Sequence, residues 1–568
     1  MIGAAALLSL LLVPQGGPAS DPPTTRTPPA PLSAAAVRAA QPPVIDGRGD
    51  DAVWSTAQPI TAFREWQPNE GAESKYPTEA RVAFDASYIY FFVRAFDAHP
   101  DSIIRLLARR DTWTAADKIG VMIDSYHDRR TGYEFWVNPS GVKMDAAIYD
   151  DGNEDDAWDA VWDVATRIDS LGWTAEFRIP LSQMRYGAQR EHTFAFVLLR
   201  DIYRYNQRTS WPVFSQSRAG MVNQFADLTG MDDLEAPRRL EVSPYAVTKN
   251  ETRYDADGFG RRQAATLGAD LKYRVASNLT LDATVNPDFG QVEADPGVYN
   301  LTAYESFFSE RRPFFVAGRG LFRIDVNCTA VNDCGTGEGL FYSRRIGRTP
   351  SLAGAYGDQN PQQPTTILGA GKLTGRFPGG FTLGVLDAVT QRASGPGDSV
   401  TYEPRTNFAV VRASQDLRHG ESSVGGMITA VNRQMDAFSS PYLNRNAYVG
   451  AVDFSHRFPG RRYQVWGSAD FSRVAGSAEV IAAEQRSSVH YYQRPDRGLA
   501  LDSTRTTLTG DAEQLNFGKV AGEHTRFQTS LQHRSPGFEI NDLGYLQRAD
   551  QLAWSTWAIL ALLEVEIP

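Results

Sequence analysis

The sequence predicts an all-β protein with two parts, an N-terminal β-sandwich and a C-terminal antiparallel β-barrel. Residues 41–236 contain short runs of β-branched and aromatic residues, separated by turn signals and without helical periodicity. From about residue 239 onward the runs are longer and alternate between apolar and polar residues. No apolar run reaches the roughly 18 to 20 residues that a transmembrane helix needs, so a membrane-spanning form of this chain has to be a barrel.

Net charge excludes one large class of partner. The 568 residues carry 57 Lys and Arg against 67 Asp and Glu, so the net charge is 57 − 67 = −10. Proteins that bind nucleic acids gain affinity by placing Lys and Arg against phosphates. We therefore expect no nucleic-acid partner.

The N-terminus has the features of an export signal. Residues 2–13 are apolar and are followed by a small-residue site at residues 17–19, which predicts a signal peptide over residues 1–19. A Pro-rich linker is predicted over residues 20–40, because a helix does not survive that density of prolines. Export places the chain in the cell envelope.

The predicted sandwich occupies residues 41–236. Residues 80–84 and 88–96 are two strand-like runs separated by residues 85–87, which predicts a hairpin. The second run is apolar on both faces and is therefore predicted to be a central strand. In residues 173–179 the alternation places Trp173 on the apolar face, so we expect its side chain in the core.

The predicted barrel occupies residues 237–568. In residues 266–275 one face carries Leu267, Leu271 and Val275 while the other carries Asp270 and Lys272. Alternation of the same period recurs in residues 280–286, 448–458, 463–472 and 527–531. This pattern is typical of outer-membrane barrels, with the apolar side facing lipid, although a soluble sandwich or propeller alternates as well. The final residues show no closing strand, so we expect the barrel to be incomplete at the C-terminus.

The cysteine count predicts one disulfide. Cys328 and Cys334 are the only cysteines, and they lie in one short polar segment. In an exported protein two neighbouring cysteines usually close a loop, so we expect a Cys328–Cys334 bond.

Tryptophans of the sandwich region are the candidate carbohydrate-binding residues. A sugar ring is held by aromatic faces against its C–H surface and by a few directed hydrogen bonds. We select Trp66, Trp113 and Trp136; Trp136 lies opposite Tyr133 and Phe135 on its strand, on the polar face. The alternative is that each of them packs in the interior.

An acidic run at residues 150–156 offers several oxygen ligands. We select Asp150, Asp151, Glu154 and Asp156 as candidate calcium ligands, because Ca²⁺ accepts flexible carboxylate cages. The spacing is not that of an EF-hand, since Asp156 stands where the loop glycine would be. A solvated acidic loop is the alternative.

Several long strings carry a family resemblance. Residues 43–47 (PVIDG), 50–54 (DDAVW), 80–85 (ARVAFD) and 88–90 (YIY) resemble the family 9 carbohydrate-binding module, a β-sandwich often attached to xylanases. Residues 124–139 (DSYHDRRTGYEFWVNP) and 173–181 (WTAEFRIPL) are similar to the form of that module found at the front of exported bacterial proteins. Residues 286–295 (NPDFGQVEAD) and 305–316 (ESFFSERRPFFV) are similar to the uncharacterised outer-membrane barrel domain that follows it.

The resemblance covers about residues 41–568 and sets expectations for ligands. Characterised members of the module family clamp the end of a glycan between two tryptophans, and family members carry calcium. The barrel family implies no activity, but its members usually continue past the point where this chain ends. The two-tryptophan clamp is not assigned to a named pair of this sequence, whereas the calcium implication agrees with the acidic run at residues 150–156.

No catalytic signature accompanies these features. The sequence contains no G-x-S-x-G, H-E-x-x-H or P-loop motif, and its eight histidines show no metal-ligand spacing. We therefore expect a carbohydrate-binding protein anchored in outer-membrane lipid, whose ligand is a polysaccharide or envelope glycan. Two alternatives remain: a hydrolase of O-glycosyl bonds in carbohydrate catabolism, with two carboxylates in a cleft, and a structural or transport barrel whose sandwich binds nothing.

Overall fold

A computed structural model describes most of the chain. The described residues are 32–156, 158–187, 189–234, 240–255, 258–276, 278–287, 299–330, 332–333, 337–357, 364–377, 379–458, 460–496, 498–522 and 524–560. The predicted signal peptide at residues 1–19 therefore lies outside them.

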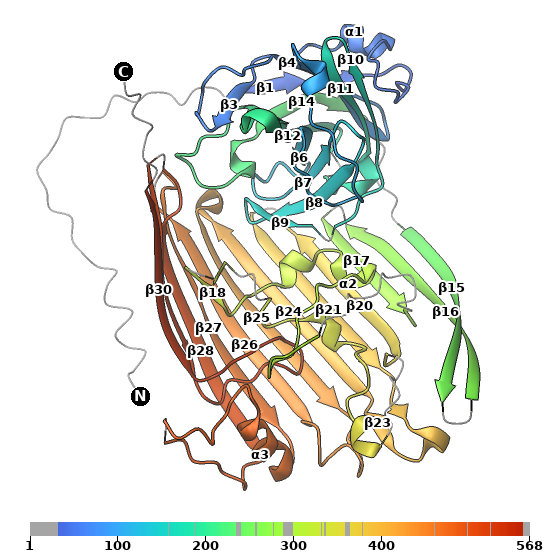
Figure 1. Cartoon of the computed structure of the whole chain (residues 1–568), viewed down its shortest axis with the longest axis vertical. Helices are drawn as coiled ribbons and strands as arrows, with labels where there is room; N and C mark the ends of the chain where they lie inside the picture. Colours follow the sequence, from blue (N-terminus) through green and yellow to red (C-terminus); the bar gives the residue numbers. More distant parts are fainter. Residues whose placement is uncertain are drawn as a thin grey trace, which may run out of the picture. The chain divides into compact units, whose positions relative to one another are not determined.

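The N-terminal part consists of two packed β-sheets (Figure 1). The larger, nine-stranded sheet contains β1 (Ser33–Ala35), β3 (Arg64–Gln67), β6 (Lys118–Asp124), β7 (Gly132–Val137), β8 (Lys143–Tyr149), β9 (Asn153–Asp155), β12 (Glu191–Ile202), β13 (Gln207–Trp211) and β14 (Ala226–Asp232). The five-stranded sheet has the order β10-β11-β5-β4-β2 and contains β2 (Val37–Arg38), β4 (Thr78–Phe84), β5 (Tyr88–Phe96), β10 (Asp163–Asp169) and β11 (Gly172–Pro180). The predicted sandwich is confirmed, with β4 and β5 forming the expected hairpin and β5 lying centrally between β4 and β11.

The sandwich core lies between these two sheets. Trp173, Phe177 and Ile179 of β11 are fully buried in it, as their alternation predicts. On the opposite face of β11 the buried Glu176 accepts hydrogen bonds from the indole nitrogen of Trp54 (2.8 Å) and from the backbone nitrogen of Gly47 (2.9 Å). That carboxylate attaches the segment before β3, including the short helix α1 (Ala52–Thr56), to the outside of the sheet.

The predicted linker is shorter in the structure than residues 20–40. β1 pairs in parallel with β14, and β2 pairs in parallel with β4, so both strands belong to the sandwich. Residues 32–41 contain no proline, and their N–H groups are therefore available to the ladders.

The C-terminal part is a single antiparallel sheet of twelve strands in sequence order. It contains β15 (Leu240–Asp255), β16 (Gly258–Ala276), β17 (Leu279–Val285), β20 (Ile367–Arg376), β21 (Phe381–Thr390), β24 (Thr406–Leu417), β25 (Ser422–Arg433), β26 (Asn446–Arg457), β27 (Tyr463–Ala475), β28 (Thr507–Lys519), β29 (Thr525–Arg534) and β30 (Gln551–Leu560). The all-β class and the antiparallel arrangement are confirmed. Among the described residues no ladder joins β15 to β30, so this sheet is open.

The two faces of the twelve-stranded sheet have opposite chemistry. On one face large apolar side chains are exposed, for example Val452 of β26 (59%) and Phe471 of β27 (60%). On the other face polar side chains are buried, including Asp470, Asn516 and Gln532. The alternation predicted from the sequence is confirmed, and it is inverted relative to a soluble protein, whose exposed faces are polar.

The buried face of the sheet is covered by the long connection between β17 and β20. Within it lie α2 (Pro313–Val316), β18 (Cys328–Thr329) and β19 (Asn332–Asp333). The Lys372 ammonium of β20 donates to the backbone oxygens of Phe314 and Ala317, and Arg534 of β29 donates to the backbone oxygen of Val326 (2.8 Å). These bonds attach the connection to β20 and β29, two strands that lie far apart in the order of the sheet.

The remaining elements are short. They comprise β22 (Ala393–Ser394), β23 (Thr401–Glu403), α3 (Ala478–Arg486) and the 3-10 turns Pro100–Ser102, Leu181–Gln183, Tyr203–Tyr205, Val222–Gln224, Arg319–Phe322, Ser343–Arg345, Gly354–Tyr356, Pro396–Asp398 and Arg418–Gly420. Within the described ranges, no helix has the length and apolar character to cross a bilayer.

Candidate functional site

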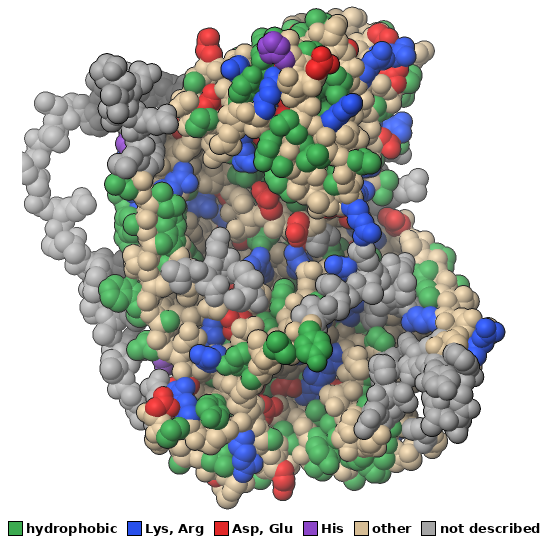
Figure 2. Space-filling model, in the orientation of Figure 1, with side chains coloured by type: hydrophobic (Ala, Val, Ile, Leu, Met, Phe, Trp, Pro, Cys, Tyr) green, Lys and Arg blue, Asp and Glu red, His purple; other side chains and the backbone are tan. Residues whose placement is uncertain are grey.

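A cavity of about 950 Å³ is lined by the outer face of the nine-stranded sheet and by the twelve-stranded sheet. Figure 2 shows a recess in this region, with acidic and basic side chains at its edges. Trp66, Trp113 and Trp136, the three tryptophans selected from the sequence, all line this cavity. They come from β3, from the segment before β6, and from β7, so the fold brings together residues that are far apart in the sequence.

Trp136 lines the sandwich side of the cavity, but it is only 6% exposed and packs in a buried cluster with Met122 and Met144. It faces Gly120 across the β6–β7 ladder, and a Cβ at Gly120 would lie 2.6 Å from the indole ring. The missing side chain at Gly120 therefore lets the ring lie flat on the neighbouring strand. The indole nitrogen of Trp136 donates to Oε2 of Glu134 at 2.9 Å, which restricts the orientation of the ring.

Trp113 offers the most accessible aromatic surface. Its side chain is 56% exposed, and its ring meets Trp136 edge-on, with centroids 5.4 Å apart and planes at 76°. The Lys118 ammonium lies 4.4 Å from the centre of the Trp113 ring, a cation–π contact. The ring is therefore held on two sides while much of its surface remains open.

Trp66 lines another part of the same cavity. Its ring packs edge-on against Phe214 at 5.7 Å, and the Arg208 guanidinium lies 5.6 Å from its centre. The Trp66 indole nitrogen is buried and has no hydrogen-bond partner among the described residues.

Polar groups from both parts of the chain complete the cavity. On the sandwich side, burial together with the neighbouring Glu154 carboxylate raises the pKa of Glu134 to about 7, and burial also raises the pKa of Glu154. On the side of the twelve-stranded sheet the lining includes the carboxylate of Asp453, the aromatic residues Phe454 and Trp466, and many hydroxyl, amide and guanidinium groups, among them Ser423, Ser455, Gln464, Ser468, Gln514, Arg526 and Gln528. The cavity thus combines flat apolar surface with many hydrogen-bonding groups, as a saccharide site requires.

Arginine side chains bind carboxylates of the acidic loop at residues 150–156 in this structure. Both Arg457 and Arg461 donate to Oδ2 of Asp151 at 2.7 Å, and Asn223 donates to the same carboxylate. Arg130 lies 3.0 Å from Asp150. Three carboxylates of the set, those of Asp150, Asp151 and Glu154, line the cavity, whereas the Asp156 side chain is 93% exposed and lies 3.7 Å from Arg319. Calcium binding by this loop stays a prediction, and the contacts show a further role, ion pairing with the ends of β26 and its following turn.

The cysteines lie beside the same region. Cys328 lines the cavity and is disulfide-bonded. Cys334, its expected partner, lies outside the described residues.

Several lining residues were not selected from the sequence. Glu134 stands two residues before Trp136, so period-two alternation places both on one face and could have identified it. Arg208 and Phe214 lie on and after β13, and only its pairing with β3 brings them to Trp66. The residues from the twelve-stranded sheet carry no local signal for a site, because their role depends on contact between the two parts.

Comparison with protein families divides the chain in the same way. Residues 45–217 match the family described as carbohydrate family 9 binding domain-like, and residues 236–565 match a family described as a domain of unknown function, DUF5916. No curated protein matches the sequence.

Solved structures similar to this chain are of two kinds. A family 9 carbohydrate-binding module from Caldicellulosiruptor kristjanssonii, solved with cellotriose, is 14% identical; the match covers 36% of this chain and 94% of that one, with a TM-score of 0.25. OprB of Pseudomonas putida is 9% identical, with 78% and 92% covered and a TM-score of 0.27. OmpT, an outer membrane protein of Vibrio cholerae, is 8% identical, with 57% and 98% covered and a TM-score of 0.20.

The second family match spans more than half of the chain and coincides with the twelve-stranded sheet and its connections. The chain therefore belongs to the DUF5916 family and carries, in front of that domain, a carbohydrate family 9 binding domain-like sandwich.

Proposed function

We propose that this protein binds a carbohydrate in the cavity lined by its sandwich and its twelve-stranded sheet. The observation that carries the proposal is that Trp66, Trp113 and Trp136, from three separate segments of a carbohydrate-binding-type domain, line one polar cavity. The exposed ring of Trp113 offers a platform for the C–H face of a pyranose. Glu134 and the hydroxyl and amide groups of the opposite wall offer partners for sugar hydroxyls.

We further propose that the twelve-stranded sheet holds the protein in an outer membrane. Its exposed face is apolar and its covered face is polar, which suits lipid outside and a polar interior. Aromatic rings also gather at one end of β27, β28 and β29, where Tyr463 stacks on Phe517 at 6.2 Å and Phe527 lies 5.9 Å from Phe517. Such rings are typical of the membrane–water interface.

The lengths of the loops indicate how the twelve-stranded sheet would be oriented across the membrane. At one end the connections are short: residues 277–278, 377–380, 418–421, 458–462 and 520–524. At the other end the turn at residues 256–257 is short, but the other connections are long: residues 286–366, 391–405, 434–445, 476–506 and 535–550. Outer-membrane barrels have short periplasmic turns and long extracellular loops.

The sandwich contacts the short connections. Arg130 donates to the backbone oxygen of Gly420 at 3.0 Å, and the backbone nitrogen of Gly522 donates to the backbone oxygen of Gln216 at 3.0 Å. In an outer membrane the sandwich and its cavity therefore face the periplasm, and the ligand is a glycan that reaches that compartment.

The test is glycan-array binding by the full chain in detergent, with and without calcium. Trp113→Ala and Trp136→Ala are expected to reduce binding at least tenfold, since each removes an aromatic face from the cavity. Tyr203→Ala is the matched control, because Tyr203 is a half-exposed aromatic residue of the sandwich that does not line the cavity. Failure of the folded wild-type protein to bind any glycan would overturn the proposal and favour a structural or transport role. Binding that needs calcium would support a metal role for the loop at residues 150–156.

Hydrolysis of a glycosidic bond is a second candidate function. It is favoured by Glu134 and Glu154, two carboxyl groups with raised pKa values that line the same cavity. Glycosidases use one protonated and one ionised carboxyl group on either side of the scissile bond. Release of reducing sugar from a bound glycan, lost in Glu134→Gln, would establish this activity, and binding without release would exclude it for that glycan.

A further inference from the structure

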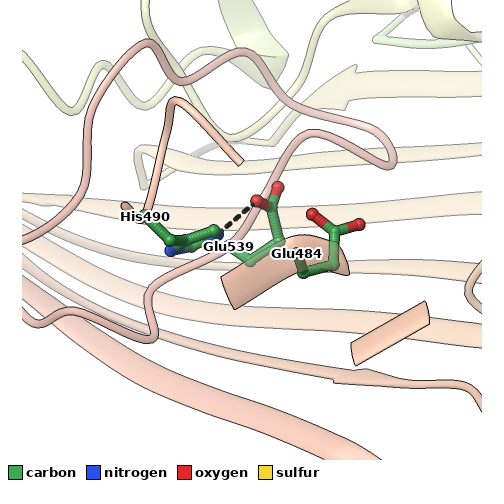
Figure 3. A group of neighbouring side chains, drawn as sticks. All are labelled: Glu484, His490 and Glu539. Atoms are coloured by element: carbon green, nitrogen blue, oxygen red, sulfur yellow. Dashed lines mark hydrogen bonds and ion pairs between the residues drawn. The ribbon is translucent and has the colours of Figure 1, made fainter. Parts of the chain in front are cut away.

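Two long connections of the twelve-stranded sheet meet in a buried cluster far along the chain from the cavity residues of the sandwich. Residues 476–506 join β27 to β28 and contain α3, whose N-terminus is capped by Ser477 Oγ accepting from the backbone nitrogen of Val480 (3.3 Å). Residues 535–550 join β29 to β30. Glu484 lies in the last turn of α3, His490 lies in the turn that follows, and Glu539 comes from the second connection (Figure 3).

The imidazole of His490 is held in one orientation. His490 is 1% exposed, and its Nδ1 lies 2.7 Å from the backbone oxygen of Pro536. A carbonyl oxygen only accepts, so Nδ1 carries the hydrogen and donates it there. Nε2 forms a hydrogen bond with Oε2 of Glu539, 2.7 Å away, so a proton lies between these two atoms, and a metal ion bound at Nε2 would take its place. Histidines that bind metals are commonly oriented in this way, by a hydrogen bond from the other ring nitrogen to a backbone carbonyl.

The three side chains bring their potential metal-ligand atoms close together. One ligand atom from each of Glu484, His490 and Glu539 lies within 4.8 Å of the others. Figure 3 shows both carboxylates on the same side of the imidazole. Glu539 is 3% exposed, so its charge is removed from water and needs a cationic partner, which is the His490 imidazole when no metal ion is bound.

The surroundings supply an observation independent of the three side chains. A cavity of about 380 Å³ is lined by the two glutamates of the cluster, Glu484 and Glu539, but not by His490. Its lining also includes Asn444, Asp542, Arg345, Arg348 and Arg433. Asn444 is 5% exposed, and its Nδ2 donates to Oε1 of Glu484 and to Oδ2 of Asp542, both at 3.1 Å. Oδ1 of the same amide is buried without a hydrogen-bond partner among the described residues. A Cβ at Gly476 would lie 3.4 Å from this oxygen, so Oδ1 lies beside the start of the connection that carries α3, while the amide nitrogen faces Glu484.

We propose that Glu484, His490 and Glu539 bind a divalent transition-metal ion, for which Zn²⁺ is the best match. One imidazole with two carboxylates suits zinc, manganese or iron, whereas calcium and magnesium prefer sites made of oxygen alone. Three protein ligands leave one tetrahedral position for a water molecule from the adjacent cavity. The ion joins the two long connections, which no ladder pairs with each other in the described residues, and thereby stabilises that end of the sheet.

The experiment uses the full chain in detergent after removal of metals with a chelator. ZnCl₂ is titrated by calorimetry, with CaCl₂ and MgCl₂ in parallel, and bound metal is counted by elemental analysis. We expect one tightly bound zinc per chain, a rise in Tm, and slower proteolysis of residues 476–506. Calcium and magnesium are expected to produce none of these effects.

Three variants distinguish zinc binding at this site from zinc binding elsewhere on the protein. His490→Asn and Glu484→Gln are each expected to weaken zinc binding at least tenfold. Glu484→Gln leaves the buried His490–Glu539 pair intact, so it keeps the test valid if His490→Asn fails to fold. His533→Asn is the matched control, because His533 belongs to a second, exposed group with Asp511 and Glu513 and should leave the tight zinc in place. Absence of zinc binding in the wild type, or zinc binding lost only in His533→Asn, would overturn the proposal and leave His490 and Glu539 as a buried ion pair.

Discussion

At the residue scale, the candidate carbohydrate site depends on how Trp136 and its neighbours are held. Gly120 makes room for the Trp136 ring, Glu134 binds its indole nitrogen, and Trp113 closes against its edge. None of these contacts requires a ligand, so the aromatic surface is formed before any sugar arrives. Preorganisation of this kind lowers the entropic cost of binding.

The raised pKa of Glu134 predicts a pH dependence of stability. An unfolded glutamate titrates near pH 4.3, whereas burial and the neighbouring Glu154 raise the pKa of Glu134 to about 7. Between these values the folded chain binds more protons than the unfolded chain, so the free energy of unfolding falls as pH rises. We expect a loss on the order of 2 kcal/mol between pH 5 and pH 8.

Urea unfolding of the full chain in detergent at the two pH values measures this effect. Glu134→Gln keeps an acceptor for Trp136 and should remove most of the difference. Glu191→Gln, at an exposed glutamate of β12, serves as the control and should leave it unchanged. An equal pH dependence in wild type and Glu134→Gln would show that Glu134 is ionised throughout.

At the element scale, the strands of the C-terminal part expose apolar residues and cover polar ones. In β26, Tyr448, Val452 and Phe454 are exposed. In β27, the alternating Ser468, Asp470 and Ser472 are buried. Exposed apolar surface in water costs roughly 25 cal/mol per Å², so this arrangement supports the proposed placement of the sheet in lipid.

A charge in the middle of β26 tests this arrangement directly. Val452→Arg is expected to lower the stability of the protein in lipid vesicles by about 2 to 4 kcal/mol, because the guanidinium would lie near the bilayer midplane. Val161→Arg is the matched control, since Val161 is an exposed valine of the sandwich (74%) and its replacement should change stability by less than about 0.5 kcal/mol. Equal effects of the two substitutions would contradict placement of the sheet in lipid.

At the scale of the whole molecule, buried and half-buried ion pairs join the sandwich to the twelve-stranded sheet. Asp151 of the acidic loop is bound by Arg457 and Arg461, and Asp128 lies 3.0 Å from Arg376. Asp151 is 1% exposed, so these charges are shielded from water and screened little by salt.

Removal of the Asp151 charge should loosen this contact. Asp151→Asn leaves two arginines without a carboxylate and is expected to cost on the order of 3 kcal/mol. Limited proteolysis should then cut the segment between β14 and β15 faster than in the wild type. Asp163→Asn, at an exposed Asp163–Arg178 pair of the sandwich, is the control and should cost less than about 1 kcal/mol. Unchanged cleavage in Asp151→Asn would mean that the remaining contacts, such as Asp128–Arg376, hold the two parts together without the Asp151 charge.

The orientation in the membrane is open to a direct test in cells. Epitope tags are inserted at Gly71, in an exposed loop of the sandwich, and at Gly498, in the connection between β27 and β28; neither position has a neighbouring atom that a side chain would meet within 4 Å. Antibody should reach the Gly498 tag on intact cells and the Gly71 tag only after permeabilisation. The reverse result would place the sandwich outside the cell.

Much of this architecture is determined by the sequence itself. Period-two alternation predicted both the strands and their two faces, because successive side chains of a strand point to opposite sides whatever the rest of the chain does. The aromatic and acidic candidates were also visible, since residue type alone limits what a side chain can bind. Residues 20–40 show the limit of this approach, because their prolines predicted a linker and gave no sign of the short strands β1 and β2.

Only the tertiary structure decided which residues share a site. Trp66 meets Phe214 through the pairing of β3 with β13, and Asp151 meets Arg457 and Arg461 across some 300 residues of sequence. The acidic loop illustrates the consequence, because its carboxylates indicated calcium while two arginines, from a distant strand and the turn after it, bind Asp151. Such contacts depend on the packing of complete sheets, and local sequence patterns contain no information about which distant charge will arrive.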